Sequence, residues 1–340
     1  MCRKNKYLPV PRLYLLWRIR TNYKRVKNII IITQGLSRIV KPLFEHDGIK
    51  IIGIIECAPR VIAKPSSSLV ISTYRKIFGF TESDLLAFSK NNDIPYFYMN
   101  NSSNELAEWV KRINPDLIVV YVMSQLLKEN IFSLPRFGTI NLHPSLLPNY
   151  RGPNPCFWSY YNMDKIGGVT VHFLDRGEDT GDILLQEEYK IPIGIKSPDR
   201  FDTLISKIGV RLLIKAIENI ESILPTKQPP VSPTLRARNL KLAEHKTIID
   251  WHNWPIERIW HVLRGTELWL NAISEPKGIY AGTRWNIGEY QKIEIQDNWD
   301  LGKIYKKRGK YFIACMEGVI YIDTKVNLKA LFSRFLNKYL

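Results

Sequence analysis

The stretch Asn141-Leu142-His143-Pro144-Ser145-Leu146-Leu147-Pro148 carries more information about this 340-residue chain than any other. Residues 137–141 form a short strand pattern, so an amide and an imidazole stand two residues apart where the strand ends. Side chains at positions i and i+2 of a strand point to the same side. We therefore expect Asn141 and His143 to share one face at the edge of a sheet.

A second polar cluster lies at residues 175–182, Asp-Arg-Gly-Glu-Asp-Thr-Gly-Asp, after one more helix and strand. Four prolines between residues 144 and 155 surround Arg151-Gly152 in the loop between the clusters. Proline at this density lowers the conformational entropy of a loop, so the polar groups beside it are held in place. The two clusters together predict an active site built from two loops.

Apolar strand patterns alternate with helical patterns on both sides of this stretch. Continuous β-branched runs, such as residues 28–33 and 117–122, are typical of parallel strands that are buried on both faces. The expected strands are residues 28–33, 50–56, 94–97, 117–122, 137–141, 168–174 and 183–191, and the expected helices are 81–92, 105–113 and 201–223. This order predicts an α/β fold with an open, Rossmann-like, mostly parallel sheet. Gly35 after the first strand lacks the paired glycines of a dinucleotide fingerprint, so NAD binding has little support.

The chain divides into four parts by composition. Residues 1–27 form a basic N-terminal extension, and residues 28–223 form the catalytic domain. Residues 224–247 read as a linker, because four prolines extend the segment 224–235. From residue 248 to 340, one helix at 256–264 and short strands separated by glycine turns predict a smaller β-barrel-like (OB-like) domain.

Charge and cysteine content narrow the class of protein. The net charge of +17 suggests an anionic partner, but residues 1–27 hold nine Lys and Arg and no Asp or Glu, so much of the excess sits in the extension. That extension is interpreted as a tail packed on the domain or as a contact with an anionic surface. No apolar run approaches the roughly 20 residues of a membrane helix. The 4 cysteines have no metal-site spacing, which favours a cytoplasmic protein without a metal or disulfides.

The ordered motifs resemble the formyltransferase family that uses 10-formyltetrahydrofolate. The matching residues are Asn141 to Pro148, Tyr150-Arg151-Gly152, Gly168-Val169-Thr170, and Asp175 with Asp179-Thr180-Gly181-Asp182. The resemblance covers residues 28–223 and continues more faintly through Ile249-Asp250-Trp251. It implies a formyltransferase that moves a formyl group from 10-formyltetrahydrofolate to a primary amine without a metal.

The resemblance also assigns residues by motif position. Asn141, His143 and Asp179 align with the catalytic residues of the family. The segments that line its folate pocket align with Met123, Ser124, Gln125, Leu126, Leu127, Asp175 and Gly177. Candidates for contact with the substrate are Ser145, Arg151 and Gly152, although Arg151 is equally consistent with a structural role. Ser145 is expected to shape the loop rather than act as a nucleophile, and His172 is interpreted as a core histidine.

These residue types suit formyl transfer. An Asn amide can donate to the carbonyl oxygen as negative charge develops there. His143 can donate to that oxygen or take the proton of the amine. Asp179 can orient the imidazole, favour its charged form or accept the proton itself. Which of His143 and Asp179 takes the proton is left open.

Two acceptors are considered, an amino sugar on a nucleotide carrier and, as the alternative, the amino group of methionyl-tRNA. The sugar is favoured because the family's tRNA enzymes have Gly-Thr-Pro-x-Phe where this chain has Thr33-Gln34-Gly35-Leu36-Ser37. The loop at residues 58–80 is also apolar at its centre rather than basic. The basic residues that favour tRNA lie at 236–241 and at Lys303, Lys306, Lys307, Arg308 and Lys310. A third hypothesis is a folate or nucleotide binder without activity, which intact Asn141, His143 and Asp179 disfavour. The oligomeric state is not predicted.

Overall fold

The computed structural model describes residues 26–58, 84–100, 103–123, 125–267, 269–281 and 283–324, without the side chains of 198 and 201–203. Most of the expected N-terminal extension and of the loop at 58–80 lies outside the described residues. Within these ranges, every helix is too short or too polar to cross a membrane.

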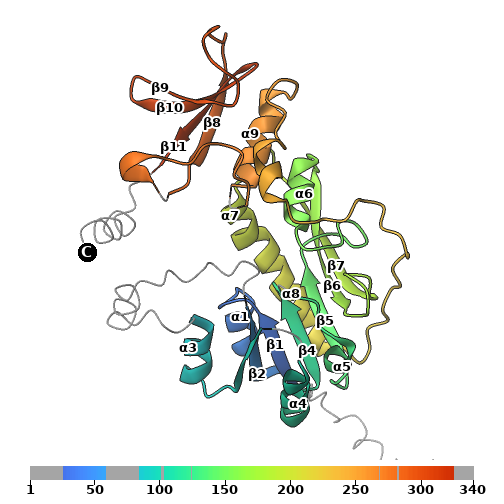
Figure 1. Ribbon diagram of the computed structural model, residues 1–340. Coiled ribbons are helices and arrows are strands. Elements are labelled where there is room, and N and C mark those ends of the chain that lie inside the picture. The colour runs from blue at the N-terminus through green and yellow to red at the C-terminus, as the bar shows by residue number, and fades with distance from the viewer. Residues whose placement is uncertain are drawn as a thin grey trace, which may run out of the picture.

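Seven strands form one mixed, mostly parallel sheet in the order β3-β2-β1-β4-β5-β6-β7, which confirms the predicted fold class (Figure 1). Strands β1 to β5 run parallel, whereas at one edge β6 is antiparallel to β5 and β7 is antiparallel to β6. Their bounds are β1 Lys27–Thr33, β2 Ile49–Cys57, β3 Tyr96–Met99, β4 Leu117–Tyr121, β5 Thr139–His143, β6 Ile166–Phe173 and β7 Ile183–Lys190.

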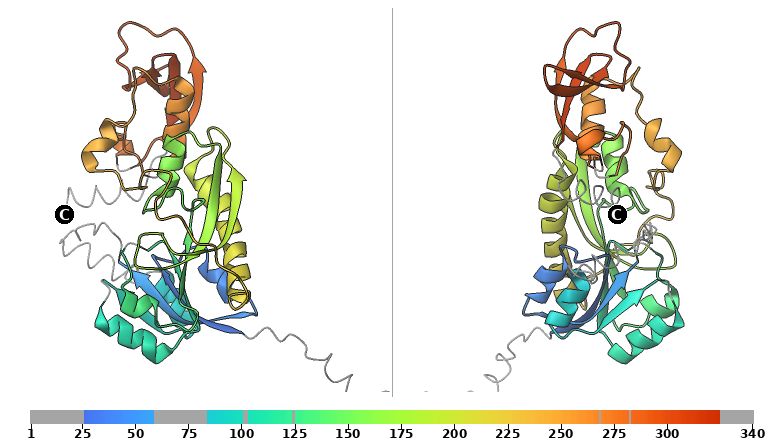
Figure 2. Two further views of the ribbon diagram at one scale, coloured as in Figure 1. Left: turned by 90° about the vertical axis from the view of Figure 1, so that its right-hand side faces the viewer. Right: turned by 60° about the vertical axis from the view of Figure 1, so that its left-hand side comes forward.

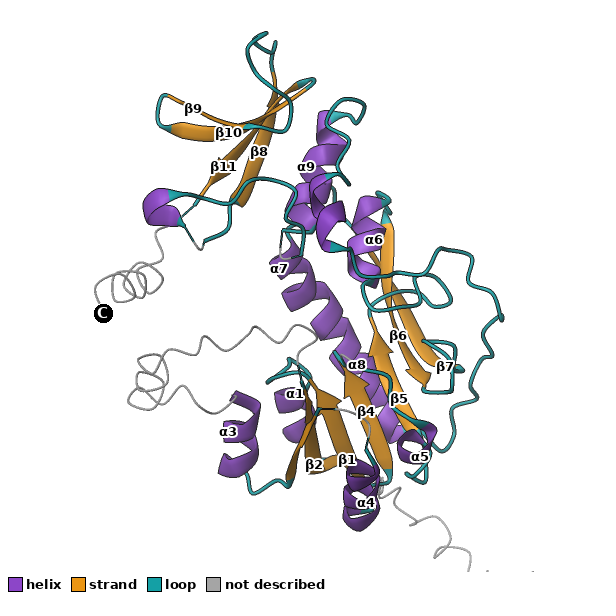
Figure 3. Cartoon of the chain, in the orientation of Figure 1, coloured by secondary structure: helices purple, strands orange, loops and turns teal. Residues whose placement is uncertain are grey.

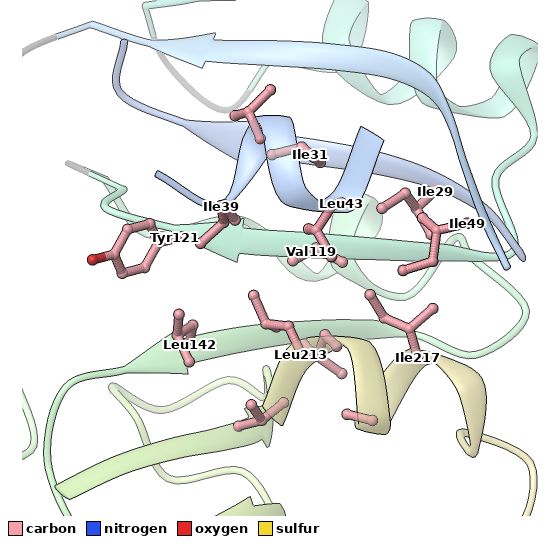
Figure 4. Packing of buried hydrophobic residues seen from close by; sticks show 14 of the residues in the cluster. Ile29, Ile31, Ile39, Leu43, Ile49, Val119, Tyr121, Leu142, Leu213 and Ile217 are labelled. Atoms are coloured by element: carbon pink, nitrogen blue, oxygen red, sulfur yellow. The ribbon is translucent and has the colours of Figure 1, made fainter. Parts of the chain in front are cut away.

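Helices cover both faces of this sheet, which is why its central strands are continuously apolar. Ile29 and Ile31 of β1 pack in the core beneath α1 (Val40–Phe44) and α8 (Ser206–Glu218). The alternate residues Ile30 and Ile32 pack on the other face with α4 (Asn104–Ile113). Figure 4 shows Leu213 and Ile217 of α8 and Leu142 of β5 in the first of these cores.

The remaining helices of this unit are short. They are α3 Asp84–Asn91, α5 Glu129–Phe132, α6 Pro155–Tyr161 and α7 Ser197–Asp199. The helix expected at residues 201–223 begins instead as a π-helical turn, Arg200–Ile205, and α8 ends at Glu218. The side chain of Asn219 donates to the carbonyl of Lys215 there, and this local bond competes with continuation of the helix.

The strand order places the polar residues at one edge. The chain runs outward from β1 to β3 and then returns to β4 on the other side of β1, so the strand order reverses between β1 and β4. Open α/β sheets bind ligands beyond the carboxyl ends of the strands at such a reversal. Gln34, Val122 and His143 stand at or just past the carboxyl ends of β1, β4 and β5.

The C-terminal residues form a separate unit at the end of the molecule far from β1 to β3 (Figure 2). It contains α9 (Ile256–Gly265) and an antiparallel sheet in the order β8-β11-β10-β9. The strands are β8 Asn286–Lys292, β9 Ile304–Lys307, β10 Lys310–Cys315 and β11 Gly318–Asp323. Among the described residues this sheet is open rather than closed into the expected barrel. One of the glycines expected to form turns, Gly288, lies instead inside β8, next to Ile287, which packs into the core.

Candidate active site

Strands β5 and β6 bring Asn141 and His172 face to face. The two residues are direct partners in the antiparallel register of these strands, and opposed residues share one face of a sheet. Asn141 Nδ2 lies 3.1 Å from His172 Nε2. The other ring nitrogen, Nδ1, is 2.8 Å from the carbonyl oxygen of Phe173 and donates to it. His172 Nε2 is therefore the acceptor that orients the Asn141 amide.

His143 stands two residues further along β5 and on the same face as Asn141, as the spacing predicts. Its Nε2–H donates to the carbonyl of Tyr150 at 3.0 Å. Its Nδ1 lies 3.6 Å from Asp179 Oδ2. In the neutral imidazole the proton sits on Nε2, so Nδ1 is the nitrogen with a lone pair that can accept a proton.

Asp179 completes the cluster from the loop between β6 and β7. Its backbone is left-handed, with φ of 55°, which an Asp tolerates better than most residues. Oδ2 accepts the N–H of Gly152 at 2.9 Å, and Oδ1 lies 3.4 Å from Asn141 Nδ2 and 3.6 Å from His172 Nε2. One carboxylate thus contacts both strands and the proline-rich loop.

The charge states of this buried cluster depend on one another. Burial lowers the pKa of His143 below its ordinary 6.5, and the carboxylate of Asp179 opposes that shift only in part. Burial by itself would raise the pKa of Asp179, but His143, His172 and the Gly152 N–H hold that pKa well below its usual range. At neutral pH the site therefore holds an ionised Asp179 and a neutral His143.

A cavity of about 1230 Å³ opens beside this cluster. Asn141, His143, His172 and Asp179 all line it. The residues expected to bind the cofactor that also line it are Met123, Gln125, Leu126, Leu127, Asp175 and Gly177, whereas Ser124 lies outside the described residues. The wall formed after β4 is apolar, since Leu127 is buried and Val120 and Leu126 adjoin it. A flat, partly apolar ligand with polar edges fits such a wall.

Two residues expected to contact the substrate point elsewhere. Ser145 is buried and its hydroxyl donates to the carbonyl of Asn149. Arg151 is buried as well, and its guanidinium donates to Gln228 and to the carbonyls of Pro229 and Pro230. Neither lines the cavity. The expectation that Ser145 and Arg151 contact the substrate is therefore corrected, because the polar groups of both side chains are already hydrogen-bonded within the protein.

Gly152, the third of those candidates, does line the cavity. Its φ is +118°, and a Cβ at this position would lie 3.0 Å from the carbonyl oxygen of Ala237. Only glycine fits this backbone conformation and this close approach without strain. The consequence is that the Gly152 N–H can reach the Asp179 carboxylate.

Residues 226–238, which we call the strap, lie within the predicted linker and run along the edge of the catalytic sheet (Figure 3). The strap begins at a bridge between Thr226 and Ile183, the first residue of β7. Its other bonds join Ser232 to the Pro148 carbonyl, Thr234 to the Tyr150 N–H, and Ala237 to Arg151 and Asn154. The strap therefore covers the proline-rich loop beside the site.

The mouth of the cavity carries three basic side chains, Arg236, Arg238 and Lys241. Arg236 Nη2 donates to Glu178 at 2.7 Å, and both terminal nitrogens of Arg238 donate to Glu244. These side chains are largely solvent-exposed, so water and salt screen the pairs and each contributes little to stability. An anionic ligand can compete for such arginines at low cost.

Comparisons with known proteins assign this site to a family. A family described as "Formyl transferase" matches residues 68–217. A methionyl-tRNA formyltransferase from Clostridium tetani is 33% identical over 222 residues, which are 64% of this chain and 68% of that protein. The chain belongs to the formyl transferase family. The predicted family and enzyme class are thereby confirmed, and Asn141, His143, His172 and Asp179 lie inside the matched region.

Solved structures agree with the fold of this formyltransferase. An N-formyltransferase from Helicobacter canadensis, solved with folinic acid and dTDP-3-aminofucose, aligns with a TM-score of 0.54 at 17% identity over 88% of this chain and 99% of that one. HypX from Aquifex aeolicus, solved with tetrahydrofolic acid, aligns with a TM-score of 0.56 at 14% identity over 87% of this chain and 43% of that one. Identity this low supports the fold of the formyltransferase and not its acceptor.

His172 is the site residue that the sequence analysis missed. It was interpreted as a core residue because it lies in the middle of a predicted strand, and in the structure it is indeed buried, with 1% exposure. The signal that could have found it is its register opposite Asn141, which requires knowing that β5 and β6 are antiparallel neighbours. That pairing is a tertiary fact rather than a local pattern.

Proposed function

We propose that this formyltransferase transfers the formyl group of 10-formyltetrahydrofolate to the amino group of methionyl-tRNA. The observation that supports this choice of acceptor is the 33% identity to methionyl-tRNA formyltransferase over 222 residues. It outweighs the sequence features that favoured a nucleotide-linked amino sugar, since the sugar enzyme from Helicobacter canadensis is only 17% identical. The alternative acceptor of the sequence analysis thus becomes the leading one.

The cavity suits a folate by the chemistry of its walls. Leu126 and Leu127 would pack against the flat ring system, while Gln125 and Asp175 offer polar groups at the rim. When bound there, 10-formyltetrahydrofolate supplies an activated formyl carbon. The residues of the chain then have three tasks, which are to hold the acceptor amine, to stabilise charge on the formyl oxygen and to take a proton.

In this proposal Asn141 stabilises the charge on the formyl oxygen and His143 takes the proton. The Asn141 amide donates toward the formyl oxygen with the N–H that otherwise makes the long, 3.4 Å contact with Asp179 Oδ1, a contribution worth about 10²- to 10³-fold in rate. His143 Nδ1 would take the amine proton as the new C–N bond forms, because its Nε2–H is already donated to Tyr150 and the lone pair is on Nδ1, beside Asp179. The resulting imidazolium is stabilised on both sides, by Asp179 and by the Tyr150 carbonyl. That proton would pass to the folate nitrogen as the bond between this nitrogen and the formyl carbon breaks, so that tetrahydrofolate leaves. His172 holds the Asn141 amide in place.

A specific observation keeps the amino sugar as a second candidate. Thr33-Gln34-Gly35-Leu36-Ser37 differs from the Gly-Thr-Pro-x-Phe turn expected of a tRNA enzyme, and Gln34 lines the cavity. The basic side chains at the mouth would suit the phosphates of a sugar nucleotide as well as those of tRNA. The two acceptors must therefore be compared in one assay.

The test incubates the protein with 10-formyltetrahydrofolate and either methionyl-tRNA or a dTDP-linked amino sugar. We expect N-formylmethionine from the tRNA, with a rate at subsaturating tRNA that falls steeply with added salt as phosphate contacts are lost. His143→Ala is expected to lower kcat by about 10²- to 10⁴-fold. Formylation of the sugar nucleotide without formylation of tRNA would overturn the proposed acceptor while leaving the chemistry intact.

A further inference from the structure

Gln228 of the strap is hydrogen-bonded to the backbone of the loop that carries Asp179. Its Nε2 donates to two backbone carbonyls of the β6–β7 loop, those of Asp179 at 3.1 Å and Gly181 at 2.6 Å. Its Oε1 accepts from Arg151, at 3.2 Å from Nε and 2.9 Å from Nη2. One amide therefore joins the strap, the proline-rich loop and the loop that carries Asp179.

The orientation of this amide follows from chemistry. Carbonyl oxygens only accept and a guanidinium only donates, so the NH₂ end must face Asp179 and Gly181 and the oxygen must face Arg151. Arg151 is fixed in turn, because it also donates to the carbonyls of Pro229 at 2.7 Å and Pro230 at 3.1 Å. Gln228 is thus anchored at its oxygen end by a buried cation that is itself tied to the strap.

The hydrogen bonds from Gln228 hold the loop at Asp179, where the backbone conformation needs support. Asp179 adopts a left-handed backbone, with φ of 55°, a conformation that persists in a non-glycine residue only when its surroundings hold it. The direction of its carbonyl and the direction of its carboxylate are linked through that backbone. A bond that fixes the carbonyl therefore fixes where the carboxylate stands relative to His143.

We propose that Gln228 is a positioning residue for the Asp179 carboxylate, and that through it the strap sets the geometry of the reacting cluster. The proposal rests on the proposed function, because that is where Asp179 is given its role in formyl transfer. Gln228 does not line the cavity and makes no contact with the reacting atoms. Its effect on the reaction is exerted through Asp179.

The first test is a double-mutant cycle in kcat. Gln228→Ala is expected to lower kcat by about 10- to 100-fold, the scale of a small misplacement of a reacting group, with KM for the folate little changed. In an Asp179→Asn background the same substitution should lower kcat by less than about 3-fold, because the residue through which Gln228 acts is already disabled. Equal losses in the two backgrounds would show that Gln228 does not act through Asp179.

Two further variants separate positioning from general stability. Gln228→Glu keeps an acceptor for Arg151 and loses the NH₂ that donates to the loop, so it should remain folded and still lose activity. Val231→Ala is the matched control, since Val231 belongs to the same strap and is 77% exposed. Wild-type kcat in Gln228→Glu, or an equal loss in Val231→Ala, would overturn the proposal.

A third readout needs no acceptor at all. The carboxylate of Asp179 raises the pKa of His143 against the effect of burial, so Asp179→Asn should shift the NMR titration of that imidazole. We expect this shift to be smaller in Gln228→Ala than in wild type, and an unchanged shift would contradict the proposal. If no amine tested is formylated, the proposed function fails, while this titration still decides the role of Gln228.

Discussion

At the scale of single residues, the site depends on a neutral imidazole beside an ionised carboxylate. His143 Nδ1 and Asp179 Oδ2 are 3.6 Å apart and both groups are largely buried. Burial disfavours the charged form of the imidazole, while His143, His172 and the N–H of Gly152 keep the pKa of the Asp179 carboxyl low. A base and the charge that will stabilise its protonated form are therefore preorganised in the protein.

The titration of His143 follows from this arrangement. Its pKa lies below 6.5 because burial outweighs the attraction of Asp179, so its Nδ1 should be unprotonated throughout the neutral range. NMR of the imidazole, assigned with His143→Gln, should give a midpoint on the acid side of 6.5. Asp179→Asn should lower that midpoint further, since the carboxylate is the group that raises it. A midpoint above 6.5 would contradict the assignment of His143 as a neutral base.

Gly152 gives a second prediction at this scale. Gly152→Ala would place a Cβ at 3.0 Å from the Ala237 carbonyl oxygen with φ of +118°, which costs about 1–3 kcal/mol of strain. The backbone is expected to relax and withdraw its N–H from Asp179, so kcat should fall by about 10-fold or more as the carboxylate loses its position. Steady-state kinetics and a thermal melt measure the two effects. If the variant is destabilised but its kcat is unchanged, Gly152 does not position Asp179 for the reaction.

At the scale of elements, strand register and helix packing bring the parts together. The antiparallel pairing of β5 with β6 places Asn141 opposite His172. Helix α6 then carries the catalytic unit onto α9, because Phe157 shares one core with Ile256, Ile259 and Trp260. The two units of the molecule are joined by packed side chains of α6 and α9 and by the chain segment that contains the strap (Figure 1).

Gly265 at the end of α9 tests this packing. A Cβ there would lie 1.6 Å from Tyr160 Cδ1 on α6, so Gly265→Ala must displace the ring. Overpacking of this kind typically costs about 1–3 kcal/mol, and urea unfolding should show it as a lower free energy of unfolding. Equal stability of the Gly265→Ala variant and wild type would mean that α6 and α9 are not packed as described.

At the scale of the whole molecule, a buried histidine lies where the two units meet. His261 of α9 stacks on Tyr160 of α6 with ring centroids 4.7 Å apart, and its Nδ1 accepts the N–H of Gly194. The guanidinium of Arg200 also lies over the Tyr160 ring, 3.8 Å from its centroid. Burial and then the charge of Arg200 lower the pKa of His261 to about 4.

This histidine predicts a loss of stability in mild acid. The unfolded chain binds a proton at His261 near pH 6.5 and the folded protein only near pH 4. The contribution is therefore fully present above pH 6.5 and declines as the pH falls toward 4, by up to about 3 kcal/mol. His261→Gln should reduce the difference between the free energies of unfolding at pH 7 and pH 4.5. If both proteins lose equal stability over this window, His261 does not titrate as inferred.

Most of the fold and part of the site could be predicted because they are written in local patterns. Alternating apolar runs and helical spacing predicted the strands, including the one that carries Asn141 and His143, since residue period reflects which faces are buried. The motif order predicted the family. It also singled out Asp179 as a candidate, and the structure brings its carboxylate to His143.

Contacts between distant segments were decided only by the tertiary structure. Gln228 and Asp179 are 49 residues apart, and Arg151 and Gln228 are 77 apart. Their meeting depends on loop paths and side-chain directions that no periodicity encodes. For the same reason Ser145 and Arg151 were misplaced, and His172 was interpreted as core until the register of β5 and β6 was known. Sequence alone determined which groups could do the chemistry, whereas packing of remote segments decided which of them meet and what holds them there.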